Sequence, residues 1–86
     1  MNIREFSLKG RWVEYLSQIS EKIKAYKKRE GKSPNERELS DELAWPYSVT
    51  QDRVKRLGNN GYLVITAQKL RHGQQKLVDV AQGVSV

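Results

Sequence analysis

The chain has 86 residues, which is enough for one small domain with a single modest core. A formal net charge of +6 favours a polyanionic partner, most often a nucleic acid. The lack of cysteine excludes disulfides and thiolate metal sites, and no apolar run approaches the roughly 18 residues of a membrane span. Because the first ten residues lack the apolar core of a signal peptide, we expect a cytoplasmic protein, associated with the nucleoid or, if viral, in the host cytoplasm.

The N-terminal third contains one strongly periodic segment. Residues 1–8 alternate weakly and are interpreted as an N-terminal arm, whereas apolar residues from about Lys9 to Glu30 recur at spacings of four and three. This pattern predicts a helix whose buried face is formed by Trp12, Leu16, Ile19, Ile23 and Tyr26. Gly31 is expected to end this helix in a left-handed conformation. The basic last turn before it complements the helix dipole, contacts phosphate, or does both.

A second, shorter helix is expected to follow. The sequence SPNE predicts a capping box, with Ser33 as the N-cap and the Glu36 carboxylate reaching back to it. Leu39 and Leu43 then give an apolar stripe at helical spacing. The WPY sequence at residues 45–47 is expected to stop the helix, because proline disfavours a helical conformation for the preceding residue.

A third helix is predicted from a second capping sequence, SVTQ, which begins at Ser48, and it is expected to run to about Asn59. Its core face is formed by Thr50, Val54 and Leu57. The opposite face carries hydrogen-bonding groups, as a recognition helix in the major groove does. An ordinary solvated helix surface is the alternative interpretation.

The last third of the chain predicts a β-hairpin. Residues 62–66 are β-branched and aromatic, and residues 76–80 alternate well enough to be the antiparallel partner. Residues 67–75 are interpreted as a long basic loop with Gly73 at its turn, placed for the phosphate backbone or the minor groove. A soluble loop that happens to be basic is the alternative, and residues 81–86 are expected to form a flexible tail.

Together these elements predict an α+β fold that is mainly helical. Two short helices joined by a tight turn and followed by a strand outline a three-helix winged helix-turn-helix with a C-terminal two-stranded β-hairpin wing, over residues 9–80. Charge is unevenly spread over this domain, with a net of +5 in residues 9–32, −3 in residues 33–46 and +4 in residues 47–86. The second helix is therefore acidic, so it can approach DNA only through its N-terminal amides, or it faces away.

Catalytic chemistry is not expected. His72 is the only histidine and has no partner for a metal, and no serine has a nearby base. The glycine-containing run at residues 58–61 follows a helix and precedes a strand, which is the reverse of a phosphate-binding loop. We expect a binding protein without a metal or cofactor rather than an enzyme.

The stretch from Trp12 to about Val80 resembles a bacterial winged-helix domain, and its layout is similar to the N-terminal DNA-binding domain of the LexA repressor family. GKSPNERELSDEL follows the pattern Gly-x-x-Pro-(Thr/Ser/Asn)-x-x-Glu-(Leu/Ile)-(Ala/Ser)-x-x-Leu. VTQDRVKRLGNNGYLVI ends in the pattern Leu-x-x-x-Gly-(aromatic/aliphatic)-(Leu/Ile)-x-Ile, which also occurs in the GntR and MarR families. The resemblance implies a small sequence-specific regulator of transcription that binds double-stranded DNA.

The candidate DNA contacts fall into three groups. Residues expected to read bases are Ser48, Val49, Gln51, Asp52 and Lys55. Residues expected at the DNA backbone are Ser33, Arg53, Arg56 and Asn59. Wing residues are Lys69, Arg71, His72 and Lys76. A homodimer is expected, because one recognition helix buries too little surface for high specificity.

Two other functions remain open. A protein adaptor or inhibitor would use the acidic helix at residues 34–44 together with Trp45 and Tyr47, and an exposed Trp45 would favour it. A DNA-binding accessory factor in replication or recombination is the third possibility.

Overall fold

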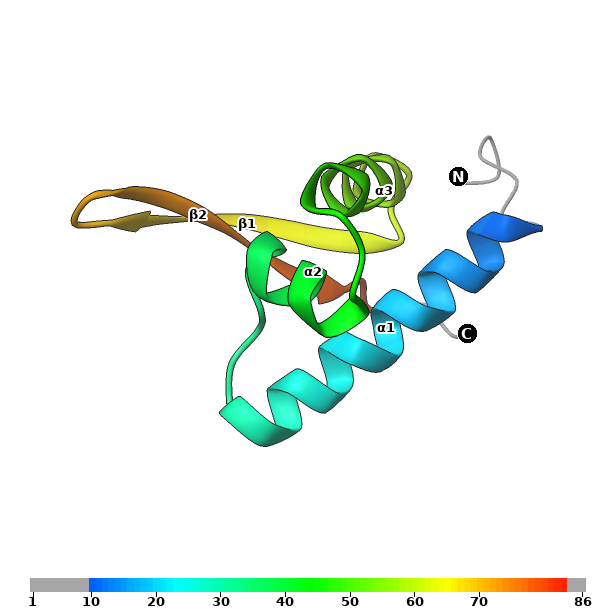
Figure 1. Cartoon of the computed structure of the whole chain (residues 1–86), viewed down its shortest axis with the longest axis horizontal. Helices are drawn as coiled ribbons and strands as arrows, with labels where there is room; N and C mark the ends of the chain where they lie inside the picture. The colour runs from blue at the N-terminus through cyan, green and yellow to red at the C-terminus, as the bar shows by residue number, and fades with distance from the viewer. Residues whose placement is uncertain (1–9, 84–86) are drawn as a thin grey trace.

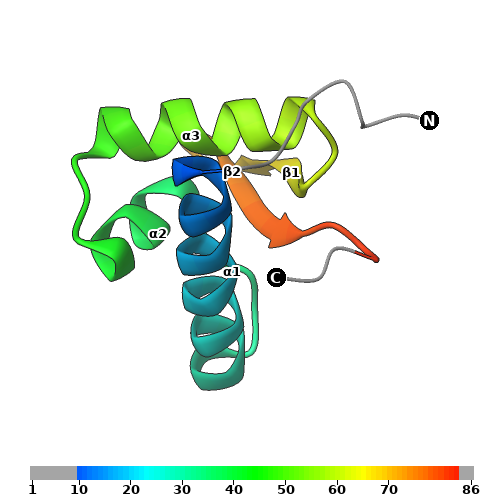
Figure 2. The same cartoon turned by 90° about the vertical axis from the view of Figure 1, so that its right-hand side faces the viewer.

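The computed structural model describes residues 10–83, so the predicted arm at residues 1–8 lies outside them. The elements are α1 (Arg11–Glu30), α2 (Glu36–Leu43), α3 (Tyr47–Asn59), β1 (Leu63–Leu70) and β2 (Gly73–Val80). Figure 1 shows that the hairpin projects from the three helices, and Figure 2 shows α3 lying across the N-terminal end of α1. The expected α+β domain, mainly helical with a two-stranded antiparallel hairpin, is confirmed.

The first helix follows its predicted pattern. Four of the five expected core residues are buried, and Trp12 is half-buried against the core. Gly31 has φ 76°, and its amide donates to the Lys27 carbonyl at 2.8 Å. This left-handed residue ends the helix as expected, because glycine has no Cβ to clash in that conformation.

The N-cap of α2 differs from the prediction. Asn35, not Ser33, caps the helix: its side chain accepts from the Glu38 amide at 2.7 Å, and the Glu38 carboxylate accepts from the Asn35 amide at 2.9 Å. Ser33 instead donates to Asp79 at 3.2 Å. The sequence contains two overlapping capping patterns, and the structure uses the second.

Tertiary pairing explains this choice. Asn35 forms an isolated antiparallel bridge with Leu77, and the buried Pro34 accepts from the Val78 amide at 2.9 Å. The segment before α2 is therefore extended alongside β2. An extended backbone at Pro34 prevents the helix from starting there, so the cap moves to Asn35.

The turn between α2 and α3 uses backbone geometry rather than the second predicted capping box. Ala44 adopts a left-handed conformation with φ 60°. Pro46 is the N-cap of α3 without a side-chain cap bond, and its carbonyl accepts from the Thr50 amide at 3.0 Å. The helix therefore begins at Tyr47, one residue before Ser48, because proline fixes φ and supplies the first carbonyl.

The core lies where the three helices meet the root of the hairpin. Thr50, Val54 and Leu57 are fully buried, which confirms the predicted inner face of α3. The buried apolar cluster consists of Leu16, Ile19, Ile23, Leu39, Val54, Leu57, Leu63 and Val78. Every helix and both strands contribute, so the fold depends on all five elements together.

The hairpin is longer and its turn tighter than predicted. Pairing runs without interruption from Leu63 opposite Val80 to Leu70 opposite Gly73, so only the two residues 71–72 form the turn. The long loop predicted at residues 67–75 is wrong. Polar residues on both faces hid the strands from periodicity analysis, because a ribbon that projects into solvent needs no apolar face.

Asp79 connects β2 to α1 and to the segment before α2. Its carboxylate accepts from Lys27 Nζ at 2.8 Å, from Ser33 at 3.2 Å and from the Val80 amide at 2.8 Å. Partial burial alone would raise the pKa of Asp79, but Lys27, the Val80 amide and Ser33 outweigh it and hold the pKa below its usual 3.8. The ionised form is therefore favoured by the fold.

We expect Asp79→Asn to remove part of the acid sensitivity of the fold. A lowered carboxyl pKa stabilises the folded state above about pH 4, and this contribution disappears as the pH falls through the folded-state pKa. At pH 7 the substitution should lower the free energy of unfolding by at most about 1 kcal/mol, because the Lys27–Asp79 pair is partly exposed. Urea denaturation at pH 7 and pH 3 measures it. The exposed Asp41→Asn is the control, and an undiminished pH dependence in Asp79→Asn would contradict the prediction.

Candidate nucleic-acid interface

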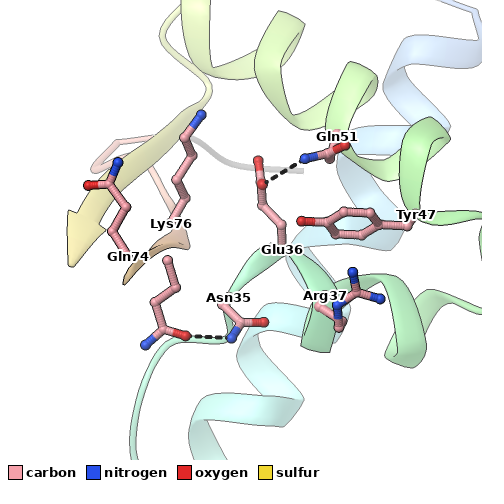
Figure 3. Close-up of a pocket in the computed structure, with 8 residues that line it drawn as sticks. Asn35, Glu36, Arg37, Tyr47, Gln51, Gln74 and Lys76 are labelled. Atoms are coloured by element: carbon pink, nitrogen blue, oxygen red, sulfur yellow. Dashed lines mark hydrogen bonds between the residues drawn. The ribbon is translucent and has the colours of Figure 1, made fainter. Parts of the chain in front are cut away.

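A continuous groove separates α3 from the hairpin. One hollow of about 480 Å³ is lined by residues that include Gln51, Lys55, Asn59 and Ile65. A second hollow of about 430 Å³, towards the start of α2, is lined by Arg37, Tyr47 and Gln74 among others (Figure 3). The two hollows share Glu36, Gln51 and Lys76. We call the combined surface the α3–hairpin groove.

Of the four predicted wing residues, Lys76 lines this groove, and the pleat of the hairpin places Lys69 on the same face. Side chains alternate along a strand, so Lys69 shares a face with Ile65, which lines the groove. Lys76 lies opposite Ala67 on the same face. Figure 3 shows Lys76 and Gln74 extending to the same side of β2. Lys69 and Lys76 therefore have a direction fixed by strand pairing, whereas the loop interpretation placed Lys69 in a long tip pointing into solvent.

On the other face of the ribbon, amide side chains tie the hairpin to the start of α2, where Asn35 and Gln75 also line the second hollow. Gln75 accepts from the Asn35 side chain at 2.6 Å and also hydrogen-bonds across the ribbon to Gln68. The N-cap residue of α2 therefore also holds the middle of the hairpin. Arg71 and His72 are exposed in the turn beyond this point, as a basic tip requires.

The predicted base-reading residues are largely accessible. Ser48, Gln51, Asp52 and Lys55 are exposed, and Val49 is half-buried. Gln51, Asp52 and Lys55 line the groove together with Asn59, which was expected at the DNA backbone. One turn of α3 thus presents an amide, a carboxylate and an ammonium group side by side.

Two residues predicted at the DNA backbone have other partners. Arg53 lies on the opposite side of α3, with its guanidinium carbon 3.7 Å from the Tyr15 ring centroid and 4.6 Å from that of Trp45. It joins α1, the α2–α3 turn and α3 through cation–π contacts. Ser33 bonds to Asp79 and is not at a helix N-terminus. Neither position supports a contact with phosphate.

Arg56 is exposed on the same side of α3. It bonds to Asp52 at 3.3 Å and lies 6.0 Å from the Trp12 ring centroid. The aromatic cluster beside it was not predicted from the sequence. In this cluster Tyr15 packs edge-to-face with Trp12 and with Trp45, at centroid distances of 5.3 and 5.8 Å. The spacing of three between Trp12 and Tyr15 was the available signal.

The acidic residues of α2 mostly have partners within the fold. Glu42 accepts from Arg29 at 2.7 Å, and Glu38 completes the capping box. Burial, together with a hydrogen bond to Glu38, raises the pKa of Tyr26 to about 12. Glu36 is close to the Gln51 amide at 3.4 Å. Glu38 and Glu42 are thus directed towards other parts of the protein, whereas Glu36 lines the α3–hairpin groove and Asp41 is exposed.

Other classes of site find no support in the part of the chain that the structure describes. Residues 10–83 hold no cluster of three or more metal-binding side chains, and none of their helices is long and apolar enough to span a membrane. Comparison of the chain with protein-family models, curated proteins and solved structures gave no match. The α3–hairpin groove, with its polar and cationic lining, is the feature on which a proposal of function can rest.

Proposed function

We propose that this protein is a winged helix-turn-helix protein that binds double-stranded DNA, as a small regulator of transcription. α3 would enter the major groove, and the hairpin would lie along the backbone or the adjacent minor groove. The main support is that Lys76 of β2 lines one groove with Gln51 and Lys55 of α3, while the strand register places Lys69 on the same face of the hairpin as Lys76. The polar side chains of α3 and the ammonium group of Lys76 thus line one concave surface.

The dimensions and chemistry of α3 fit this role. A helix of 13 residues is about 20 Å long and, with side chains, about 10–12 Å wide, which suits a major groove about 12 Å across. A glutamine such as Gln51 pairs with adenine, a lysine such as Lys55 with guanine, and an aspartate such as Asp52 accepts from cytosine. These residues are exposed on one side of the helix.

The hairpin supplies the positive charge that the phosphates require. Lys69, Arg71 and Lys76 are all exposed, and none forms an ion pair among the described residues. Their charge is therefore available to displace counterions from DNA. Because one α3 covers few base pairs, we also propose that two copies occupy adjacent half-sites.

The adaptor alternative is less well supported. It requires Trp45 and Tyr47 to be open to a partner. Trp45 is half-buried and contacts Tyr15 and Arg53, and Tyr47 is stacked with the Arg37 guanidinium at 4.3 Å. Glu38 and Glu42 of α2 also have partners within the fold, so we prefer the DNA-binding function.

The proposal is tested by fluorescence anisotropy with a random 30-base-pair duplex over a salt series. We expect affinity to fall steeply with salt, followed by selection of a preferred site from a random pool. Gln51→Ala should then weaken binding to the preferred site alone, by about tenfold, because it removes a base contact. Arg71→Ala should weaken binding to both duplexes, because it removes a phosphate contact.

Each outcome has a distinct meaning. Equal losses on preferred and random duplex for both variants would contradict the assigned roles of Gln51 and Arg71. Absence of binding by the unmodified protein at low salt would contradict DNA binding itself. It would favour the adaptor alternative, which uses Trp45 and α2.

A further inference from the structure

We infer that Glu36 orients the side-chain amide of Gln51, so that the α3–hairpin groove selects adenine or cytosine, the two bases that present an exocyclic amino group in the major groove. The inference rests on the proposed function. Glu36 is the first residue of α2 and lines both hollows of the groove, although it is only 9% exposed. Gln51 Nε2 donates to Glu36 Oε1 at 3.4 Å (Figure 3).

The chemistry of the two groups fixes their orientation. A carboxylate has only acceptors, whereas a glutamine amide has an oxygen acceptor on one side and an NH₂ donor on the other. Gln51 must therefore turn its NH₂ group to Glu36. Within residues 10–83 Glu36 forms no ion pair with Arg37 or Lys76, although both line the groove. The amide is thus the donor that compensates the nearly buried carboxylate.

This orientation determines which base edge fits. Gln51 presents its carbonyl oxygen and its remaining N–H away from Glu36. Adenine offers a complementary N6 donor and N7 acceptor in the major groove, and cytosine offers an N4 donor. Guanine and thymine present only hydrogen-bond acceptors there, so the Gln51 oxygen would find no donor and only the remaining N–H could pair. An amide free to rotate would offer its NH₂ group to them instead, so the discrimination depends on Glu36.

The test is Glu36→Gln, a substitution of nearly equal shape whose amide both donates and accepts. The preferred duplex is permuted through all four bases at the position where Gln51→Ala abolishes discrimination. For the unmodified protein we expect adenine or cytosine to be favoured over guanine about tenfold at that position. Glu36→Gln should reduce this ratio to about twofold or less, and it should change nothing further in a Gln51→Ala background.

The readout is a ratio, because removing a negative charge from the groove raises affinity for all DNA. Asp41→Asn is the matched control: it removes the same charge from the exposed side of the same helix and should leave the ratio unchanged. If Glu36→Gln is poorly folded, Glu36→Asp retains the charge but withdraws the carboxylate by one methylene, and the same loss of ratio is expected.

The inference and the proposed function fail differently. A variant at position 36 that binds duplex with the original base ratio overturns the orienting role of Glu36 and leaves DNA binding intact. A ratio that falls equally in Asp41→Asn also overturns it, because net charge would then be the cause. If the unmodified protein binds no duplex, both fail.

Discussion

Leu39→Ala is expected to lower the free energy of unfolding by about 2–5 kcal/mol, the usual cost of truncating a buried leucine. Leu39 is fully buried and belongs to the core cluster. α2 has only eight residues and is too short to be stable alone, so it depends on this side chain for its attachment. A domain of this size is stable by about 5–15 kcal/mol, and the melting temperature should fall by about 10–30 °C. Thermal and urea denaturation followed by circular dichroism provide the measurement.

Leu70→Ala is the matched control for this prediction. Leu70 lies near the hairpin turn and is 46% exposed. The same chemical change there should alter stability by less than about 0.5 kcal/mol. Equal losses at the two positions would show that α2 is not anchored through Leu39.

Among the substitutions considered, the double substitution Lys55→Gln, Lys76→Gln is expected to have the largest effect on the affinity for DNA and on its salt dependence. Both ammonium groups line the α3–hairpin groove, one from α3 and one from β2. If each neutralises one phosphate, the slope of log affinity against log salt becomes shallower by about 2, since each contact contributes roughly 0.9. Affinity at low salt should fall by about tenfold or more. Anisotropy titrations at several salt concentrations measure both quantities.

Lys24→Gln, Lys28→Gln is the control with the same change in net charge. Both lysines are exposed on α1 and neither lines the groove. We expect a smaller change in slope. An equal change would mean that the overall field of the protein, rather than the groove, attracts the DNA.

The helices were the most predictable part of this fold. The stripe from Trp12 to Tyr26 identified α1 and its buried side, because a helix that packs on one core must repeat its apolar residues at helical spacing. The inner face of α3 at Thr50, Val54 and Leu57 followed from the same rule. The buried faces of α1 and α3 could be predicted because each requires only a local apolar pattern and a core to pack against.

The caps were less predictable, since they depend on neighbours distant in sequence. Ser33 and Asn35 are both good capping residues, and both have a glutamate three positions later. The choice is made by β2, whose Val78 amide holds Pro34 in an extended conformation. No local pattern reports that contact.

The site was predicted in composition but not in geometry. Gln51, Lys55 and Asn59 were identified on the outer side of α3, and they line the groove. The stacking of Arg53 between Tyr15 and Trp45 could not be foreseen, because it joins residues from three parts of the chain. The extension of the strands to Leu70 and Gly73 was also hidden, since their polar residues carry no apolar alternation.

The two ends of the hairpin have different mechanical support. At its root, Leu77 is bridged to Asn35, and Leu63 and Val78 are buried in the core. Beyond Gln68 and Gln75, whose pair is tied to Asn35, the ribbon is held by its own cross-strand bonds and is exposed on both strands. Segments with so few buried contacts open at low free-energy cost while the core stays folded. The ribbon is therefore anchored at one end only, and in the DNA complex proposed above its tip would adjust to duplexes of different groove width while α3 keeps its position.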